Sequence, residues 1–131
     1  FVVAPMDPVS LQTGVGQAPP LAVAGTVALF ALFLSLTAHL AARNVLGDVP
    51  VRNAFLVGPL PAAIAVVAAA LELPSLPAVG VALVVDALVI RYVYDLDRRL
   101  TAGVTLIHAV VSVILGAILF SLYVLVRSAP G

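Results

Sequence analysis

Two ionisable side chains lie inside long apolar stretches of the sequence, and they are the first candidates for chemistry. Asp86 is near the middle of the apolar run 76–94, and His108 lies in the run 102–126. An aspartate at the centre of a bilayer costs about 2.5 to 3.5 kcal/mol on insertion scales, so Asp86 must face protein, water or a partner chain. Intramembrane carboxylates of this kind often mark ion paths.

The depths of the two side chains predict that they pair. At 1.5 Å per residue, Asp86 lies about 12 Å and His108 about 9 Å from the ends of their runs that face the same short connection. Runs joined by a short loop are antiparallel neighbours, so the carboxylate can orient or charge the imidazole. Two interpretations stay open, because such a pair either specifies helix packing through a hydrogen bond or moves protons.

Further polar and small residues accompany His108 at steps of three and four, which places them on one face of a helix. Small and hydroxyl residues are usual at helix contacts in membranes, so this face predicts a packing stripe. The alternative is a polar track from Asp86 through His108 to the adjoining loop. The residues of this polar face are Thr101, Thr105, His108, Ser112 and Gly116. A comparable stripe in the second run, Gly58, Ala62, Ala65 and Ala69, predicts a close helix contact.

The elements that carry these residues have the composition of membrane spans. The 131 residues are 63% hydrophobic and 9% charged, with a mean hydropathy of +1.25, whereas soluble domains carry about 25% charged residues. The apolar runs are long enough to cross a hydrocarbon core of about 30 Å, and they lack the polar half of a soluble bundle helix. We therefore expect an all-α bundle of four transmembrane helices in two antiparallel hairpins. The runs are 21–42, 54–71, 76–94 and 102–126, in a membrane domain 21–131 that follows a flexible extramembrane arm 1–20.

The arginines predict the orientation of these spans. Loops after the first and third runs hold most of the basic residues, whereas the opposite side has only Arg127. Both loops should therefore be cytoplasmic, and both termini should lie on the outer side of the cell membrane. An interfacial anchor of tyrosines and arginines is the favoured interpretation of the second loop, with lipid phosphate binding as the alternative. If Asp95 lies on a helical extension, neighbouring arginines can pair with it. The charged loop residues are Arg43, Asp48, Arg52, Arg91, Asp95, Asp97, Arg98 and Arg99.

Several function classes find no support in the sequence. There is no cysteine, which excludes disulfides and thiol catalysis, and the net charge of zero gives no reason to expect nucleic acid. No acidic or histidine residue has metal-ligand spacing to His39 or His108, and no phosphate loop, zinc motif or serine triad is present. We therefore predict no metal, no cofactor and no enzymatic activity. The expected partners are the lipid bilayer and either further copies of the chain or a larger membrane complex.

Two sequence strings resemble a known family. NVLGDVPVRNAFLVGPLPAA at 44–63 and YDLDRRLTAGVTLIHAVVSVILGAILF at 94–120 are similar to small four-span membrane proteins of halophilic archaea with no assigned function. The resemblance covers about residues 21–126, and arginine without lysine fits the GC-rich coding of such organisms. It implies a membrane location and transfers no catalytic or ligand residues.

The function predicted from these observations is that of a small accessory, scaffold or self-assembling membrane subunit. The main alternative is a proton-linked transporter or permease that uses Asp86 and His108. A membrane-embedded enzyme acting on lipid is a third class, for which no motif is present.

Overall fold

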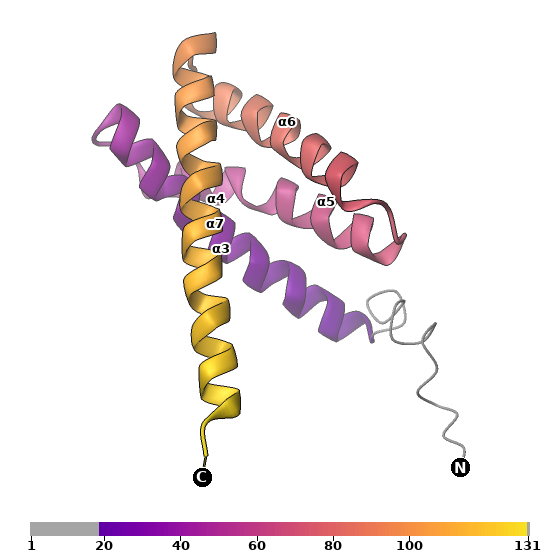
Figure 1. Ribbon diagram of the computed structural model, residues 1–131. Coiled ribbons are helices and arrows are strands. Elements are labelled where there is room, and N and C mark those ends of the chain that lie inside the picture. Colours follow the sequence, from indigo (N-terminus) through magenta and orange to yellow (C-terminus); the bar gives the residue numbers. More distant parts are fainter. Residues whose placement is uncertain (1–18, 131) are drawn as a thin grey trace, which may run out of the picture.

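The computed structural model describes residues 19–130, and the regular structure of these residues is entirely helical, which confirms the all-α prediction. Most of the predicted arm 1–20 lies outside the described residues. The helices, labelled in Figure 1, are α3 (Pro20–Leu46), α4 (Val51–Val57), α5 (Pro59–Ala70), α6 (Ser75–Tyr94) and α7 (Arg98–Ser128).

Four helical stretches are long and apolar enough to cross a membrane, with α4 and α5 together forming the second of them. Each contains nearly all of one predicted run and extends beyond it by a few residues. At the start of α7, four residues before the predicted run, the Asp97 side chain accepts a hydrogen bond of 2.8 Å from the backbone N–H of Leu100. This N-cap lets Arg98 and Arg99 join the helix. With 31 residues, α7 is about 46 Å long.

The second stretch is interrupted at Gly58 without a change of backbone conformation. Pro59 and Pro61 lie within this stretch, yet the helix begins at Val51 and Gly58 keeps helical angles (φ −60°, ψ −40°). The prolines remove two amide donors. The backbone bonds on either side remain, from Gly58 N–H to Ala54 at 3.1 Å and from Ala62 N–H to Gly58 at 3.3 Å.

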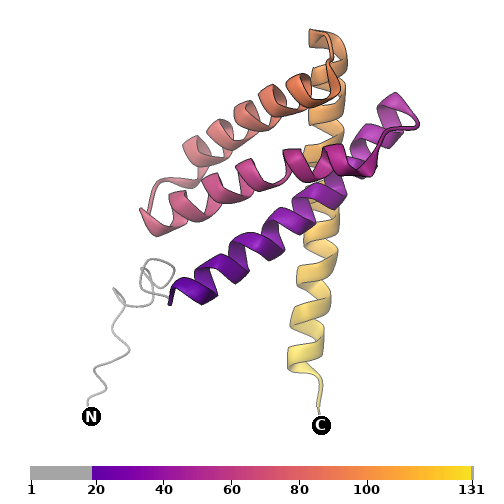
Figure 2. The same ribbon diagram turned by 180° about the vertical axis from the view of Figure 1, so that it is seen from behind.

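The helices pack in a ring. α3 contacts α4, α5 and α7, and α6 contacts the same three helices (Figure 2). The buried core lies toward the ends of the helices that carry the arginine loops. Because its members are mostly alanines, the helix backbones approach closely there. The core residues are Ala38, Ala41, Ala42, Ala54, Val57, Ile90 and Val104.

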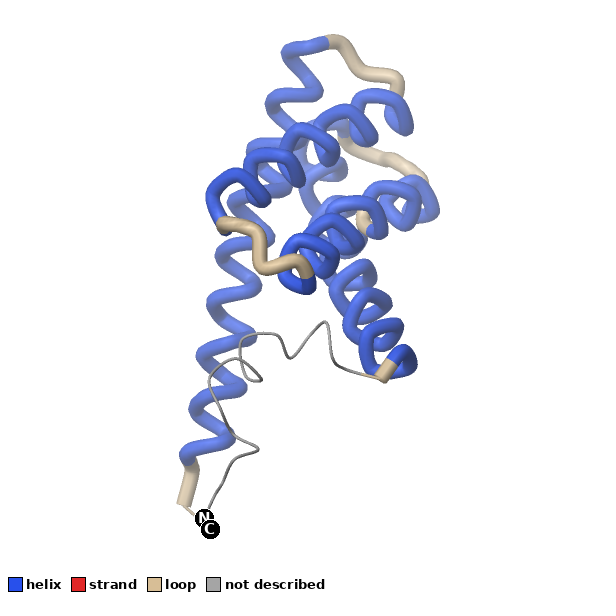
Figure 3. Tube along the Cα trace, turned by 90° about the vertical axis from the view of Figure 1, so that its right-hand side faces the viewer, coloured by secondary structure: helices blue, strands red, loops and turns tan. Residues whose placement is uncertain are grey.

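The helices diverge toward the end of the bundle that lies opposite the arginine loops. In Figure 1 the yellow half of α7 runs away from α3, and Figure 3 shows the same separation from the side. Every residue from 117 to 128 is exposed. The C-terminal part of α7 is therefore an apolar helix without a neighbour within the described chain.

The turn between α6 and α7 corrects one expectation. Asp95 does not lie on a helical extension, because it ends α6 in the left-handed conformation with φ 54°. Its neighbours Arg98 and Arg99 belong to the next helix. Among residues 19–130, no arginine forms an ion pair with a carboxylate.

Candidate functional site

Three helices bring polar side chains together near the middle of the bundle. Asp86 comes from α6, His108 and Ser112 from α7, and Thr37 from α3. Counted at 1.5 Å per residue from the arginine-bearing helix ends, Thr37, Asp86 and His108 all lie about 12 to 15 Å deep. That depth corresponds to the midplane of a hydrocarbon core about 30 Å thick.

Asp86 and His108 are in direct contact. His108 Nδ1 lies 2.6 Å from Asp86 Oδ2, within the hydrogen-bonding reach that the sequence predicted. Both residues are almost fully buried, with exposed fractions of 4% for Asp86 and 3% for His108. The contact is also the one ion-pair geometry among residues 19–130.

The other imidazole nitrogen fixes the position of one proton. His108 Nε2 lies 3.1 Å from the backbone carbonyl oxygen of Leu34 and 3.0 Å from Thr37 Oγ1. A carbonyl oxygen can only accept, so Nε2 must carry a hydrogen. The Thr37 hydroxyl itself donates to the same carbonyl at 3.1 Å and accepts from Ser112 Oγ at 2.8 Å.

This geometry gives the Asp86–His108 pair one shared proton. With Nε2 protonated, either the Asp86 carboxyl donates to Nδ1 of a neutral imidazole, or Nδ1 of an imidazolium donates to the carboxylate. Both arrangements have a net charge of zero, so moving the proton across the 2.6 Å contact transfers no net charge into the bundle. Neutrality lowers the cost of placing the pair in hydrocarbon.

One oxygen of the pair has no protein partner. Asp86 Oδ1 is buried and makes no hydrogen bond. An unpartnered oxygen costs less on a neutral carboxyl than on a carboxylate, because charged groups lose more on desolvation.

The predicted polar face of α7 is directed into the bundle at four of its positions. Thr101 and His108 are buried, and Thr105 and Ser112 are partly buried. Only Ser112 and His108 join the hydrogen-bonded network, since the Thr101 and Thr105 hydroxyls have no partner. A Cβ at Gly116 would lie 3.9 Å from Phe33 Cζ, which places this end of the face against α3.

Thr37 and the Leu34 carbonyl were missed by the sequence reasoning. Thr37 is uncharged, and it lies about 7.5 Å from the end of the first run, close to the depth of His108, which was the available signal. His39 is partly buried and lies outside the network, with a buried Nδ1 that has no partner among the described residues.

The charged loop residues do not take part in this site. All of them are exposed. The arginines lie in the helix turns that flank the α3–α4 and α6–α7 connections, the aspartates lie on the connections themselves, and none forms a hydrogen bond or an ion pair with Asp86 or His108. They are Arg43, Asp48, Arg52, Arg91, Asp95, Asp97, Arg98 and Arg99.

The small-residue stripe on the second span is confirmed in its first half only. Gly58 and Ala62 are buried, Ala65 is partly buried, and Ala69 is exposed. A Cβ on Gly58 would lie 2.6 Å from the carbonyl oxygen of Ala31, so α3 passes directly over this glycine. The stripe ends where α3 and α5 diverge.

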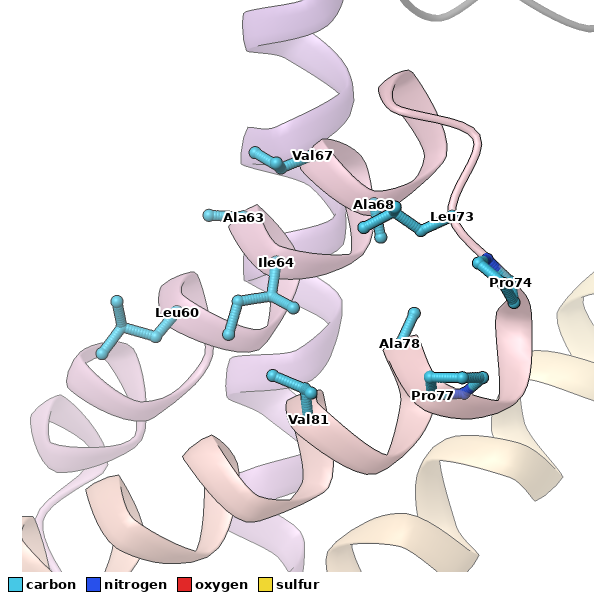
Figure 4. A pocket seen from close by; sticks show the side chains of 10 residues that line it. All are labelled: Leu60, Ala63, Ile64, Val67, Ala68, Leu73, Pro74, Pro77, Ala78 and Val81. Carbon is cyan, nitrogen blue, oxygen red and sulfur yellow. The ribbon is translucent and has the colours of Figure 1, made fainter.

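An apolar cavity of about 400 Å³ lies between α5 and α6 near the turn that joins them (Figure 4). Its lining contributes no polar surface, so it offers no group that could orient a polar ligand. The lining residues are Leu60, Ala63, Ile64, Val67, Ala68, Leu73, Pro74, Pro77, Ala78 and Val81. Within residues 19–130, no group of three or more acidic, cysteine or histidine side chains could hold a metal ion.

Comparison with known families matches residues 17–130 to the model of a family of unknown function (DUF7473). The chain belongs to this family. The DUF7473 match includes all five described helices and therefore every member of the Asp86–His108 network. No curated protein and no solved structure matches the chain.

Proposed function

We propose that this DUF7473 chain is a four-span integral membrane protein of the cell membrane, built from two antiparallel helical hairpins, with both arginine loops in the cytoplasm and both termini outside. The four long apolar helices support this arrangement. A Cβ at Gly103 would lie 3.9 Å from Val45 Cγ1, so the end of α3 lies beside the start of α7 and both arginine loops share one end of the bundle. The positive-inside rule then assigns that end to the cytoplasm.

Within the membrane, we infer that the chain serves as a self-assembling subunit. The observation that carries this proposal is the exposure of all residues from 117 to 128 of α7. Lipid can cover apolar side chains. However, a helix segment that contacts no other helix of its own chain leaves room for a helix of another molecule to pack against it.

The occupant proposed for this segment is α7 of a second copy. Ala117 and Ser121 are spaced by four residues and line a shallow groove along the helix with Ile118, Leu122 and Leu125. Small residues at this spacing let two helix backbones approach closely. A two-fold axis would place the same groove of each copy against the other, which makes the contact self-complementary.

The oligomeric state tests this proposal. In detergent or nanodiscs, the unmodified chain should run as a dimer or a larger homo-oligomer, and Ala117→Leu combined with Ser121→Leu should shift it to the monomer. Val126→Phe, on the side of α7 opposite Ala117, is the control and should leave assembly unchanged. A monomeric unmodified chain, or equal loss of assembly in both variants, would contradict the proposal.

Proton-linked transport is the second candidate, and the buried Asp86–His108 contact of 2.6 Å favours it. A pair that holds one shared proton at mid-depth can exchange that proton during a transport cycle. Flux of protons into liposomes that is present in the unmodified chain and lost in Asp86→Asn would support this function, because an amide cannot titrate. Equal proton flux in the unmodified chain and in Asp86→Asn would contradict proton-linked transport through this pair.

The remaining parts of the proposal rest on the sequence. We infer a relation to the small four-span proteins of halophilic archaea from the strings at 44–63 and 94–120. The proposal assigns the chain no enzymatic activity, no cofactor and no nucleic-acid partner. Assembly into a larger membrane complex with other proteins is the alternative to self-assembly.

A further inference from the structure

A surface hollow of about 440 Å³ lies at the arginine-bearing end of α6. Unlike the apolar cavity between α5 and α6, it includes charged and polar side chains in its lining. The residues that line it are Leu88, Arg91, Tyr92, Asp95 and Leu96. Because a cation, a phenol and a carboxylate adjoin two leucines, the hollow matches a ligand that is polar at one end and apolar at the other.

The hollow lies on the side of α6 that faces away from the bundle. Leu88, Arg91 and Tyr92 are spaced by three and four residues, which places them on one face of the helix. At 100° per residue, this face is opposite Asp86 and Ile90, the two buried residues of α6. Leu88 is 60% and Tyr92 87% exposed. In the proposed membrane placement, the hollow therefore opens to lipid.

The left-handed turn at Asp95 completes the hollow. Asp95 has φ 54°, a conformation that few residues other than glycine, asparagine and aspartate adopt. The backbone N–H of Leu96 donates to the carbonyl oxygen of Arg91 at 3.1 Å, so the chain folds back toward the last turn of α6. Leu96 then lines the hollow together with that turn. The shape of the hollow is therefore set in part by backbone hydrogen bonds and not only by mobile side chains.

The levels of the lining residues match the layers of a bilayer. With 20 residues, α6 is about 30 Å long, which equals the thickness of a hydrocarbon core. Measured from the end of α6 at Tyr94, Arg91 lies about 4.5 Å and Leu88 about 9 Å toward the midplane. The hollow thus extends from the headgroup boundary into the hydrocarbon.

The charges at this end favour a negative ligand. Five arginines and three aspartates give the arginine-bearing end an excess of two positive charges, whereas Glu72 and Arg127 balance at the opposite end of the described chain. Arg127 is also engaged by its own helix, since it donates to Tyr123 Oη at 3.0 Å and lies 5.6 Å from the centre of that ring. Arg91 is exposed and lines the hollow instead, so an anion can reach its guanidinium.

We propose that the hollow binds an anionic phospholipid of the leaflet on the arginine side, with the phosphodiester on Arg91 and an acyl chain along Leu88. A planar guanidinium can donate two parallel hydrogen bonds to phosphate oxygens. The Tyr92 hydroxyl, at nearly the same level, can donate a third. The carboxylate of Asp95 repels additional negative charge, so it favours a phosphodiester with one charge over a phosphomonoester with two.

Tryptophan fluorescence tests the inference, because the chain has no tryptophan of its own. Val84→Trp places a reporter one turn from Leu88 on the same face, and Leu36→Trp on α3 is the matched control. Both positions lie about 15 Å from the arginine-bearing end of their helix, with exposed fractions of 59% and 50%. Each precedes by seven residues an arginine in the last turn of its helix, Arg91 or Arg43.

Each variant is placed in phosphatidylcholine vesicles, and an increasing share of the lipid is replaced by chain-brominated phosphatidylglycerol or chain-brominated phosphatidylcholine. Bromine quenches a tryptophan that it touches, so the two quenching curves give the preference for the anionic lipid. The inference rests on the proposed membrane placement and is independent of self-assembly. Circular dichroism checks that each variant keeps its helices.

The preference for phosphatidylglycerol at Val84→Trp should exceed that at Leu36→Trp by about tenfold, the low end of what a hydrogen bond to a charged group contributes. Adding Arg91→Gln to Val84→Trp should reduce its preference to that of the control. Adding Arg43→Gln removes the same charge from the same end of the bundle and should leave the preference at Val84→Trp unchanged. Brominated phosphatidic acid, a phosphomonoester, should bind more weakly than phosphatidylglycerol.

The results that would overturn the inference have different meanings. If both tryptophans show the same preference, or if Arg91→Gln and Arg43→Gln lower it equally, the arginines attract anionic lipid only as a charged surface and the hollow is not a site. A preference for phosphatidic acid over phosphatidylglycerol contradicts the role of Asp95. If brominated lipid quenches neither tryptophan, the proposed membrane placement fails together with the site.

Discussion

Replacing Gly58 by alanine should force α3 away from the second span. The added Cβ would lie 2.6 Å from both the carbonyl oxygen of Ala31 and the backbone nitrogen of Ser35, and it would overlap Ser35 Oγ. Ordinary contact begins at 3.4 Å, so the two helices must separate by about 0.8 Å at the crossing. The backbone at Gly58 is helical, so glycine is required there for the close approach and not for an unusual conformation.

The magnitude follows from a matched substitution. Overpacking a tight contact costs about 1 to 3 kcal/mol, whereas alanine in place of glycine inside a helix gains about 0.5 to 1 kcal/mol. Gly80 in α6 has nothing within 4 Å of its added Cβ, so Gly80→Ala should show only the gain. The difference in the free energy of unfolding between the two variants isolates the overpacking and should be about 1 to 3 kcal/mol.

Unfolding in mixed micelles by titration with dodecyl sulfate, followed by the helical circular dichroism signal, measures both variants. Adding Ser35→Ala should not rescue Gly58→Ala, because two of the three clashing atoms belong to the α3 backbone. The reasoning is refuted if Gly58→Ala and Gly80→Ala have the same free energy of unfolding, or if Ser35→Ala restores the loss completely.

Two further substitutions test the polar groups. Asp86→Leu should lower the free energy of unfolding by about 1 to 3 kcal/mol, because it leaves His108 Nδ1 buried without a partner, whereas Asp86→Asn keeps a donor there and should be mild. The double variant Asp86→Leu with His108→Leu should recover most of the lost free energy of unfolding. Failure to recover it would show that the pair stabilises the fold through more than the hydrogen bond between its two members. Asp97→Ala removes the N-cap bond of 2.8 Å to Leu100 and should cost about 1 kcal/mol in the same titration, with Asp48→Ala, which caps no helix, as the neutral comparison.

Much of the helix pattern could be predicted because long apolar runs leave the backbone few alternatives. The helix ends were less predictable where a polar residue determines them. The helix α7 starts four residues before the predicted run because Asp97 caps it. The helix α6 ends at Asp95, whose backbone is in the left-handed conformation. Neither effect shows in hydropathy.

The site was predictable only in part. Matching depth and a short connection were enough to predict the proximity of Asp86 and His108. The contribution of Thr37 depends on which face of α3 meets α7, and that is decided by the packing of alanines such as Ala38 and Ala41. For the same reason the stripe on the second span was extended too far, to Ala69, because the sequence does not show where two helices diverge.

The side of the membrane on which the loops lie tests the four-span account most directly. Single cysteines at Ser75 and Asp97, at opposite ends of α6, are labelled in intact cells with a membrane-impermeant maleimide, and Asp48 and Ser128 provide the second pair of positions. The account predicts labelling of Ser75→Cys and Ser128→Cys from outside, and of Asp48→Cys and Asp97→Cys only after the cells are opened. Labelling of the Ser75 and Asp97 positions from the same side would contradict it.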